Sequence, residues 1–203
     1  MQDRPPCHAY NNKERMKHIM IDLETLGTAA DACILSIGAV RFDLNSQSID
    51  DQGFYASVSI DSNLEMKRRI QEDTLIWWLK QGEAAQGVFH ESKQTLETAL
   101  MEFANWLGDG ECQVWSNGAD FDLPMMAHAF TQLQMEVPWK FWNSNCFRTY
   151  KKLPGAKQIR AAQLGIKHNA MSDAYHQAQT VQMIHHKLFG PGAGKHNMIK
   201  ATV

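Results

Sequence analysis

The order of strand-like and helix-like segments is the feature that most constrains the fold of this chain. Three early segments show the apolar runs or the alternation of apolar and polar residues that strands require: residues 18–24, 34–42 and 54–60. The polar, turn-rich stretch at 45–51 predicts a hairpin between the second and third segments. We therefore expect the first three strands to form an antiparallel meander.

Helical spacing dominates the rest of the chain. Apolar residues recur on one helical face in 96–107 and again in 174–188. We also expect helices at 74–81 and 123–133, the start of another at 145–153, and a short strand at 113–116. Strands followed by alternating helices and short strands predict an α/β domain, with a mixed central sheet flanked by helices.

Length and composition fit one globular domain. The chain has 203 residues, of which 44% are hydrophobic and 21% charged, so it can bury a sizeable core. We expect a loose extension at 1–15, the folded domain at 16–190 and a flexible tail at 191–203. The sequence contains no run of 18 apolar residues, so we expect no transmembrane helix. Residues 1–15 lack the apolar stretch of a signal peptide.

Charge and cysteine content limit the possible functions. The formal net charge is -2, whereas proteins that grip long duplexes through many phosphates are usually basic. If the chain handles nucleic acid, its affinity should come mostly from a local pocket and bound metal. Its four cysteines form no C-x-x-C pair, which argues against a zinc knuckle or disulfide framework and favours a reduced, cytoplasmic setting.

Two carboxylates stand at the end of the first predicted strand. Asp22 and Glu24 are two residues apart, so they point to the same face of the strand. Adjacent like charges cost free energy unless a cation neutralises them, and Mg²⁺ prefers oxygen ligands. The alternative is an ordinary solvated strand end, because D-x-E alone is a common pattern.

Two further acidic motifs occur later in the chain. In W-S-N-G-A-D-F-D, residues 115–122, a short strand runs into Asp120 and Asp122 before a helix. In H-N-A-M-S-D, residues 168–173, His168 and Asp173 precede or begin the last helix. Taken singly, each aspartate could merely cap a helix, or interact favourably with the positive end of the helix dipole.

The three motifs together resemble the DEDDh family of DnaQ-like 3′→5′ exonucleases, to which ribonuclease T and oligoribonuclease belong. The family patterns are D-x-E-[TS]-x-G, matched at 22–27, F-D, matched at 121–122, and H-x(4)-D, matched at 168–173. Asn169 stands four residues before Asp173, which excludes the tyrosine form of the third motif. Segments 70–85 and 138–149 resemble a phage and bacterial subgroup that includes phage exonuclease A and a mycobacterial exoribonuclease.

This resemblance implies a ribonuclease-H-like fold and a two-metal hydrolysis of phosphodiester bonds at the 3′ ends of single-stranded nucleic acid. Nucleoside 5′-monophosphates would be released, with two Mg²⁺ ions as cofactors and Mn²⁺ as a substitute. His168 would be the general base. The implied metal ligands, which with His168 make up the catalytic set, are Asp22, Glu24, Asp122 and Asp173. Asn117 departs from the histidine that many relatives carry in the second motif, at a position that binds no metal.

Other assignments are less specific. By resemblance, Thr25 and Leu26 would hold the terminal sugar and base, and Phe121 would also contact substrate. Of the adjacent Trp77 and Trp78, one should lie in the core, and we expect the other, assigned as Trp78, to stack on a base. Arg148 could bind a phosphate or tie a helix to the sheet.

Several alternatives stay open on sequence alone. The chain could be a non-catalytic nucleic-acid-binding module on the same fold, or a nuclease of very short oligonucleotides. The sequence does not distinguish DNA from RNA as substrate. Homodimers occur in the family, and no interface can be derived from this sequence.

Overall fold

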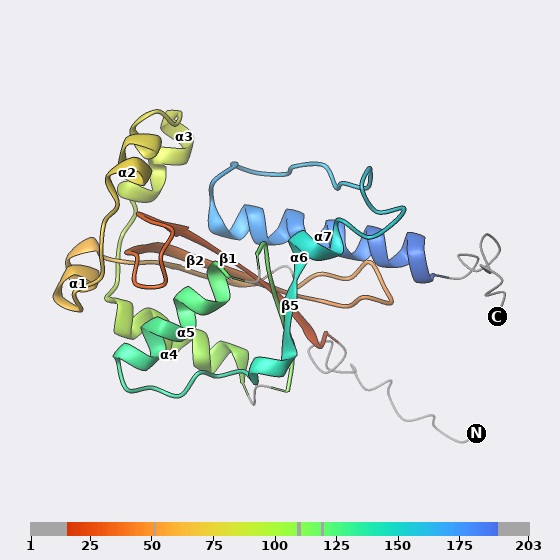
Figure 1. The fold of residues 1–203 in the computed structure, drawn as a ribbon, viewed down its shortest axis with the longest axis horizontal. Helices are drawn as coiled ribbons and strands as arrows, with labels where there is room; N and C mark the ends of the chain where they lie inside the picture. Colours follow the sequence, from red (N-terminus) through yellow and green to blue (C-terminus); the bar gives the residue numbers. More distant parts are fainter. Residues whose placement is uncertain (1–15, 51, 109–110, 119, 191–203) are drawn as a thin grey trace, which may run out of the picture.

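A mixed five-stranded sheet forms the centre of the molecule (Figure 1). The computed structural model describes residues 16–190 except 51, 109–110 and 119, so the expected extension at 1–15 and tail at 191–203 lie outside the described residues. The strand order is β3-β2-β1-β4-β5. The strands are β1 (His18–Thr25), β2 (Ile34–Phe42), β3 (Phe54–Ser57), β4 (Gln113–Ser116) and β5 (Ser144–Cys146).

The pairing of the strands confirms the predicted meander. β1 pairs antiparallel with β2, and β2 pairs antiparallel with β3. β4 and β5 extend the sheet on the other side of β1 in parallel orientation. The carboxyl ends of β1 and β4 therefore lie at the same edge of the sheet, where the predicted acidic motifs follow.

Helices cover both faces of this sheet (Figure 1). α4 (Leu96–Leu107) and α5 (Asp122–Gln132) pack on one face, and α7 (Ala170–Phe189) packs on the other. Short helices complete the chain: α1 (Ile60–Glu65), α2 (Glu72–Leu79), α3 (Glu83–Gln86), η2 (Gly87–Phe89), η3 (Phe141–Asn143) and α6 (Phe147–Tyr150). The arrangement confirms the predicted α/β class.

Alternation along β1 decides which side chains meet which helix. Ile19, Ile21 and Leu23 point into the larger core cluster with α4 and α5. Met20 points into the second cluster, with Ala174 and other residues of α7. Asp22 and Glu24 share the parity of Met20, so the strand directs both carboxylates toward the face that α7 covers.

A glycine in β2 allows α7 to approach the sheet closely at this point. A Cβ atom at Gly38 would lie 2.2 Å from the carbonyl carbon of Ala170, the first residue of α7. Gly38 is also the register partner of Asp22. Because only glycine leaves this space, the start of α7 can lie directly beside the carboxylates of β1.

Two predicted segments differ from the structure. The third strand ends at Ser57 rather than near residue 60, because the Ser59 hydroxyl caps α1 by accepting the Ser62 N–H at 3.4 Å. The helix predicted from residue 145 is wrong at its start. Asn145 and Cys146 belong to β5, which pairs with β4, and only the four residues of α6 follow. Short strands depend on a partner strand that local sequence does not reveal.

Candidate active site

Asp22 and Glu24 lie side by side on the α7 face of β1. Glu24 is buried and Asp22 partly buried. Gln177 of α7 reaches across and donates from Nε2 to Asp22 Oδ1 at 2.6 Å. Gln177 is itself buried, and its Oε1 has no hydrogen-bond partner among the described residues.

Asp122, rather than Asp120, joins this pair. It is the first residue of α5 and is 2% exposed, whereas Asp120 is exposed at the surface. Its Oδ1 accepts the Leu23 N–H of β1 at 3.1 Å, which holds the carboxylate against the strand between the two acidic residues. Its Oδ2 is buried, with no partner among the residues described.

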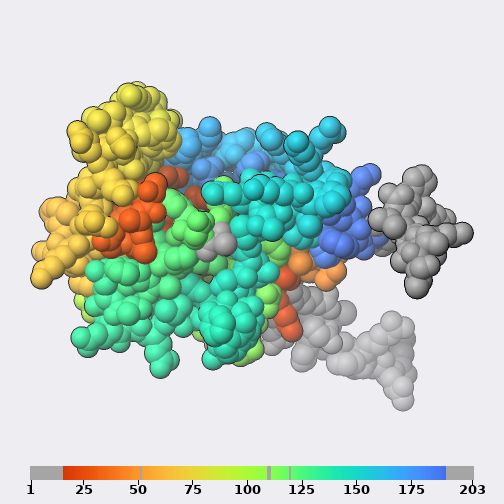
Figure 2. All heavy atoms as spheres, viewed as in Figure 1, coloured from red at the N-terminus to blue at the C-terminus, as the bar shows by residue number. Residues whose placement is uncertain are grey.

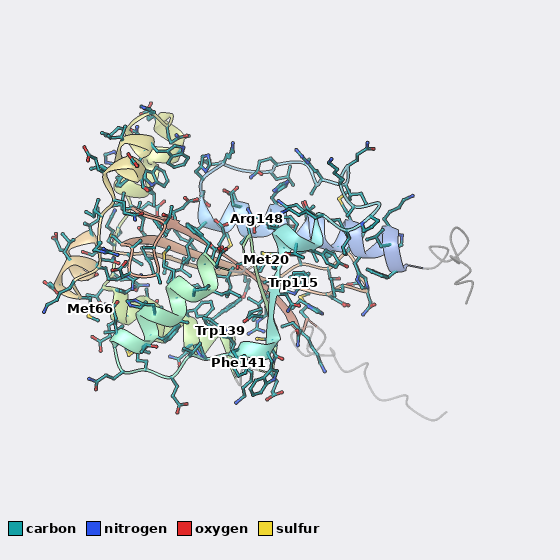
Figure 3. The ribbon with its side chains drawn as sticks, in the orientation of Figure 1. Met20, Met66, Trp115, Trp139, Phe141 and Arg148 are labelled. Carbon is teal, nitrogen blue, oxygen red and sulfur yellow. The ribbon has the colours of Figure 1, made fainter. Side chains whose placement is uncertain are left out.

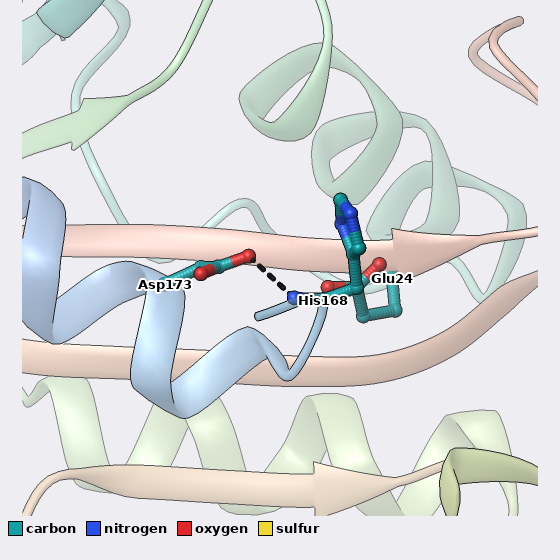
Figure 4. A group of neighbouring side chains, drawn as sticks. All are labelled: Glu24, His168 and Asp173. Atoms are coloured by element: carbon teal, nitrogen blue, oxygen red, sulfur yellow. Dashed lines mark hydrogen bonds between the residues drawn. The ribbon is translucent and has the colours of Figure 1, made fainter. Parts of the chain in front are cut away.

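His168 and Asp173 complete the cluster from the start of α7. Asn169 caps this helix by accepting the Ser172 N–H at 3.1 Å. The Asp173 carboxylate accepts the His168 N–H on Oδ2 at 3.0 Å, as Figure 4 shows, and the Gln163 amide on Oδ1 at 2.9 Å. One ligand atom each of Glu24, His168 and Asp173 all lie within 4.8 Å of one another.

The backbone of His168 is held in an unusual conformation. Its φ is +63°, in the left-handed region that non-glycine residues seldom adopt, although histidine does so more readily than most. The hydrogen bond from the His168 N–H to Asp173 stabilises this turn. The imidazole ring of His168 packs edge-to-face on the Trp77 ring, with ring centroids 4.9 Å apart. These contacts aim the imidazole at the carboxylates.

The carboxylates raise one another's pKa values. Burial, followed by the charges of Asp173 and Asp122, raises the pKa of Glu24 to about 8. Burial and three neighbouring carboxylates raise the pKa of Asp22 well above its usual range, against the hydrogen bond from Gln177. Burial raises the pKa of Asp122 to about 7, although backbone N–H groups and Arg148 oppose the shift.

The pKa of His168 moves the other way. Burial is the main cause of a pKa below the usual value, and Lys167 adds to it, while Asp173 opposes it. The imidazole is therefore neutral at neutral pH, as a proton acceptor must be.

A divalent cation fits this arrangement. The donor set is mainly carboxylate oxygen, which suits Mg²⁺ or Mn²⁺, and the cluster holds excess negative charge that a cation would neutralise. The buried oxygens Asp122 Oδ2 and Gln177 Oε1 have no donor within the described chain. A cation and its hydration shell would satisfy such atoms.

Of the expected substrate-binding residues, Phe121 is partly exposed, whereas Thr25 and Leu26 are buried. Phe121 is partly buried at the start of α5, beside Asp122. Thr25 is buried, and its hydroxyl donates to the Gly27 carbonyl at 2.7 Å. Leu26 is 1% exposed, and its backbone N–H and C=O already bond to Cys33 and Gln71. Leu26 therefore presents no free group to a sugar or base in this conformation.

The two tryptophans of α2 need a correction. Trp78 is 1% exposed and donates from Nε1 to the Thr25 carbonyl at 2.9 Å, so its ring is in the core and cannot stack on a base. Trp77 is 39% exposed and contacts the ring of His168. The helix places the two rings on different sides, and the sequence expectation chose the wrong one.

Arg148, labelled in Figure 3, borders the site through its contact with the turn that leads to Asp122. It extends from α6 and donates from Nη2 to the Asn117 carbonyl at 2.7 Å, which ties α6 to the turn between β4 and α5. Its charge also reaches Asp122 and lowers the pKa of that residue. Asn117 thus contributes its carbonyl to this contact.

Comparison with known proteins decides the family. Residues 17–185 match the model of the 3′-5′ exoribonuclease Rv2179c-like domain. The chain belongs to this family. Membership confirms the predicted DnaQ-like family and the predicted enzyme class, a 3′→5′ exonuclease.

Relatives of the Rv2179c-like domain extend to phage. An exodeoxyribonuclease of Enterobacteria phage T4 is 23% identical over 159 residues, which cover 66% of this chain and 70% of that protein. The family name and this relative point to different sugars, so they do not decide between RNA and DNA.

Solved structures confirm the ribonuclease-H-like fold. Cell-death related nuclease 4 matches with a TM-score of 0.54 and 14% identity, over 81% of this chain and 62% of that one. E. coli ExoI in its zinc-bound complex with single-stranded DNA matches with a TM-score of 0.60 and 13% identity. That match covers 86% of this chain, which spans only 41% of the ExoI chain.

Among the described helices, none is both long and apolar enough to cross a bilayer.

Proposed function

We propose that this Rv2179c-like domain removes nucleotides one at a time from the 3′ end of single-stranded DNA or RNA, with two divalent cations, Mg²⁺ or Mn²⁺. The observation that carries the proposal is the meeting of four carboxylates from β1, α5 and α7 beside a neutral imidazole. Asp22, Glu24 and Asp173 would serve one cation position, and Asp22 with Asp122 the other. Cations bound there would stabilise the attacking and leaving oxygens as Lewis acids.

The chain's own residues would position the reactants and move the proton. A ring nitrogen of His168 accepts a proton from the water whose oxygen attacks the phosphorus. The bond between phosphorus and the 3′ oxygen of the preceding nucleotide breaks. That oxygen takes up a proton from solvent water to become a 3′-hydroxyl, and a nucleoside 5′-monophosphate leaves. Gln177 holds Asp22 in place throughout, and the Leu23 N–H holds Asp122.

The closed surroundings of β1 support an end-acting site. Beyond Glu24 the chain turns through residues that are packed under α2, where Trp78 bonds to the Thr25 carbonyl. This packing would limit how far a bound nucleic acid strand could continue past Glu24, which favours the entry of a free end. A 3′ terminus is the end that the family assignment specifies.

The test uses a matched pair of aspartates. Labelled DNA and RNA oligonucleotides, linear or circular, are incubated with Mg²⁺ or with chelator. We expect a 3′-shortened ladder and nucleoside 5′-monophosphates from linear strands in Mg²⁺, and no turnover in chelator. Asp122→Asn should lose about 10²-fold or more in rate, whereas Asp120→Asn, two residues away and exposed, should keep it.

Two outcomes would contradict the proposal. Digestion of the circular strand would show an endonuclease, and equal losses from both aspartate variants would remove Asp122 from the site. A 3′-phosphate should block the enzyme and a 5′-phosphate should not. The homodimer and the cytoplasmic location expected from the sequence stay predictions.

A further inference from the structure

One segment of the chain concentrates positive charge. Residues 137–172 contain seven of the chain's 20 Lys and Arg and none of its 22 Asp and Glu, although the whole chain has a net charge of -2. The basic segment is defined here as residues 140–167. Its cations are Lys140, Arg148, Lys151, Lys152, Lys157, Arg160 and Lys167, all exposed except the partly buried Lys151.

These cations lack acidic partners. The only ion pair that joins described residues is Arg69–Asp31, far from the basic segment in sequence. Charges of both signs are normally interspersed, so seven cations without an acidic residue in one segment favour a binding role for an anionic partner. The net charge of the chain hides this feature.

Part of the basic segment borders the active site on the β4–α5 side. Arg148 bonds to the Asn117 carbonyl at 2.7 Å, and Lys151 Nζ donates to Asn117 Oδ1 at 3.5 Å while lying 4.2 Å from the centroid of the Phe147 ring. Asn117 is in the turn that leads to Asp122. Arg148 thus lies close enough to lower the pKa of Asp122, and Lys151 contacts the same turn.

The remainder of the basic segment returns along α7. Ala161 donates its N–H to Thr180 Oγ1 at 3.1 Å, and Gln163 bonds to Asp173 at 2.9 Å. Asp173 and Thr180 are seven residues apart, about 10 Å along a helix. Arg160 therefore lies about two helical turns from the site, and its charge together with that of Arg148 helps to lower the pKa of Lys151 after burial does.

The helices near the opposite border of the site begin with acidic residues, although the exposed Lys80 ends α2. α2 begins with Glu72 and Asp73, and α3 begins with Glu83, all exposed. In Figure 2 the cyan residues of the basic segment form a continuous surface on the front face, with the yellow α2–α3 region at its far upper corner. A nucleic acid strand that leaves the site is therefore attracted more strongly toward the basic segment than toward α2 and α3.

We infer that the basic segment binds the phosphates of the nucleic acid strand upstream of the bond that is cleaved, so that the enzyme prefers strands of several nucleotides to dinucleotides. This inference rests on the proposed function. A nucleic acid strand fits better than an acidic protein. The basic segment includes Arg148 beside Asp122, and the 3′ end of a bound strand must lie at that carboxylate. The net charge of -2 led us to expect affinity mostly from the local pocket and bound metal, and the basic segment would add to it.

The test compares two triple variants with the same change in charge. Lys152→Gln/Lys157→Gln/Arg160→Gln removes exposed cations of the basic segment that make no ion pair within the described chain. The control, Lys17→Gln/Lys67→Gln/Lys80→Gln, removes three exposed cations elsewhere. kcat/KM is measured for a dinucleotide and a 12-nucleotide single strand over a range of salt concentrations, with thermal unfolding as the check on folding.

We expect the first variant to lose about tenfold in kcat/KM on the 12-nucleotide strand and less than about twofold on the dinucleotide. Its plot of log kcat/KM against log salt should flatten by about 2, because each phosphate contact to a single strand contributes about 0.7 to the slope. The control variant should match the wild type on both substrates. Equal losses from both variants, or equal losses on both substrates, would overturn the inference.

Binding separates this inference from the proposed function. The labelled 12-nucleotide strand is titrated in chelator and followed by fluorescence anisotropy. Weaker binding by the first variant alone supports the basic segment even if the wild type shows no turnover, which would instead refute the proposed function. Tighter binding of an acidic peptide of equal charge than of the strand would overturn the assignment to nucleic acid.

Discussion

Replacing Glu24 by glutamine should stabilise the metal-free protein while abolishing its activity. Glu24 is 7% exposed, and its pKa is about 8 in the folded chain against an ordinary value of 4.5. Folding therefore forces the carboxyl either to take up a proton or to remain as a buried charge among other carboxylates. Glutamine has nearly the same shape and no charge, so it removes this cost.

The size of the gain depends on pH in a defined way. Below about pH 4.5 the carboxyl is protonated in both states, so the substitution changes little. Between pH 4.5 and 8 the folded state binds more protons than the unfolded state, and the wild type loses stability as pH rises. At pH 7 the difference of about 2.5 pH units is worth about 3 kcal/mol at 1.36 kcal/mol per unit.

The glutamine amide carries its own cost of burial, which reduces the net gain to about 1–3 kcal/mol. For a chain of this length that gain corresponds to a Tm rise of about 3–9 °C. Thermal unfolding in chelator at pH 5 and pH 8 measures it, with the exposed Glu136→Gln as the control. Added Mn²⁺ should then stabilise the wild type at pH 8 far more than the variant.

The reasoning fails if Glu24→Gln unfolds at or below the wild-type temperature in chelator at pH 8. A gain of the same size at pH 5 would also refute it, because the effect would then have a cause other than the ionised carboxylate.

Two other substitutions test the surroundings of the cluster. His168→Asn keeps a residue that tolerates the left-handed backbone but loses the base. Turnover should therefore fall by about 10²–10⁴ while the Tm shift caused by Mn²⁺ persists. Near-normal turnover by the variant would exclude the base role. Because burial lowers the pKa of His168, protonation of the imidazole should not limit the wild-type rate at neutral pH. Gln177→Met removes the hydrogen bond to Asp22 and should raise the Mn²⁺ concentration needed for half-maximal stabilisation several-fold. Gln182→Met is the control on the same helix and loses two hydrogen bonds to loop carbonyls. It should lower Tm without changing the Mn²⁺ requirement. Equal Mn²⁺ requirements in the two glutamine variants would contradict the role of Gln177.

Long, strongly patterned segments could be predicted from the sequence. β2 and α4 have the predicted bounds, because nine residues of strand pattern or twelve of helical spacing leave one solution. The four-residue β4 was also predicted, from the short apolar run before the second acidic motif. The motif spacing also named Asp22, Glu24 and Asp122 together, which the structure brings to one edge of the sheet. The F-D pairing of the second family motif favoured Asp122 over Asp120, and the structure buries Asp122 while Asp120 is exposed.

Contacts that depend on the approach of distant elements could not be predicted. Trp78 rather than Trp77 enters the core because a carbonyl of β1 accepts its indole N–H, and helical spacing alone does not show which ring this will be. Gln177 follows Asp173 by four residues on the same helical face, a signal that was present but is common on any helix. Gly38 acquires its role only when α7 packs against β2.

The central claim is that the carboxylate cluster holds the cations of a phosphodiester hydrolase. Anomalous diffraction from crystals soaked in Mn²⁺ tests it most directly, because it locates the metal without relying on turnover. We predict Mn²⁺ peaks beside Asp22, one shared with Glu24 and Asp173 and one with Asp122. Absence of any peak among these residues, at a Mn²⁺ concentration that supports nuclease activity in solution, would contradict the account.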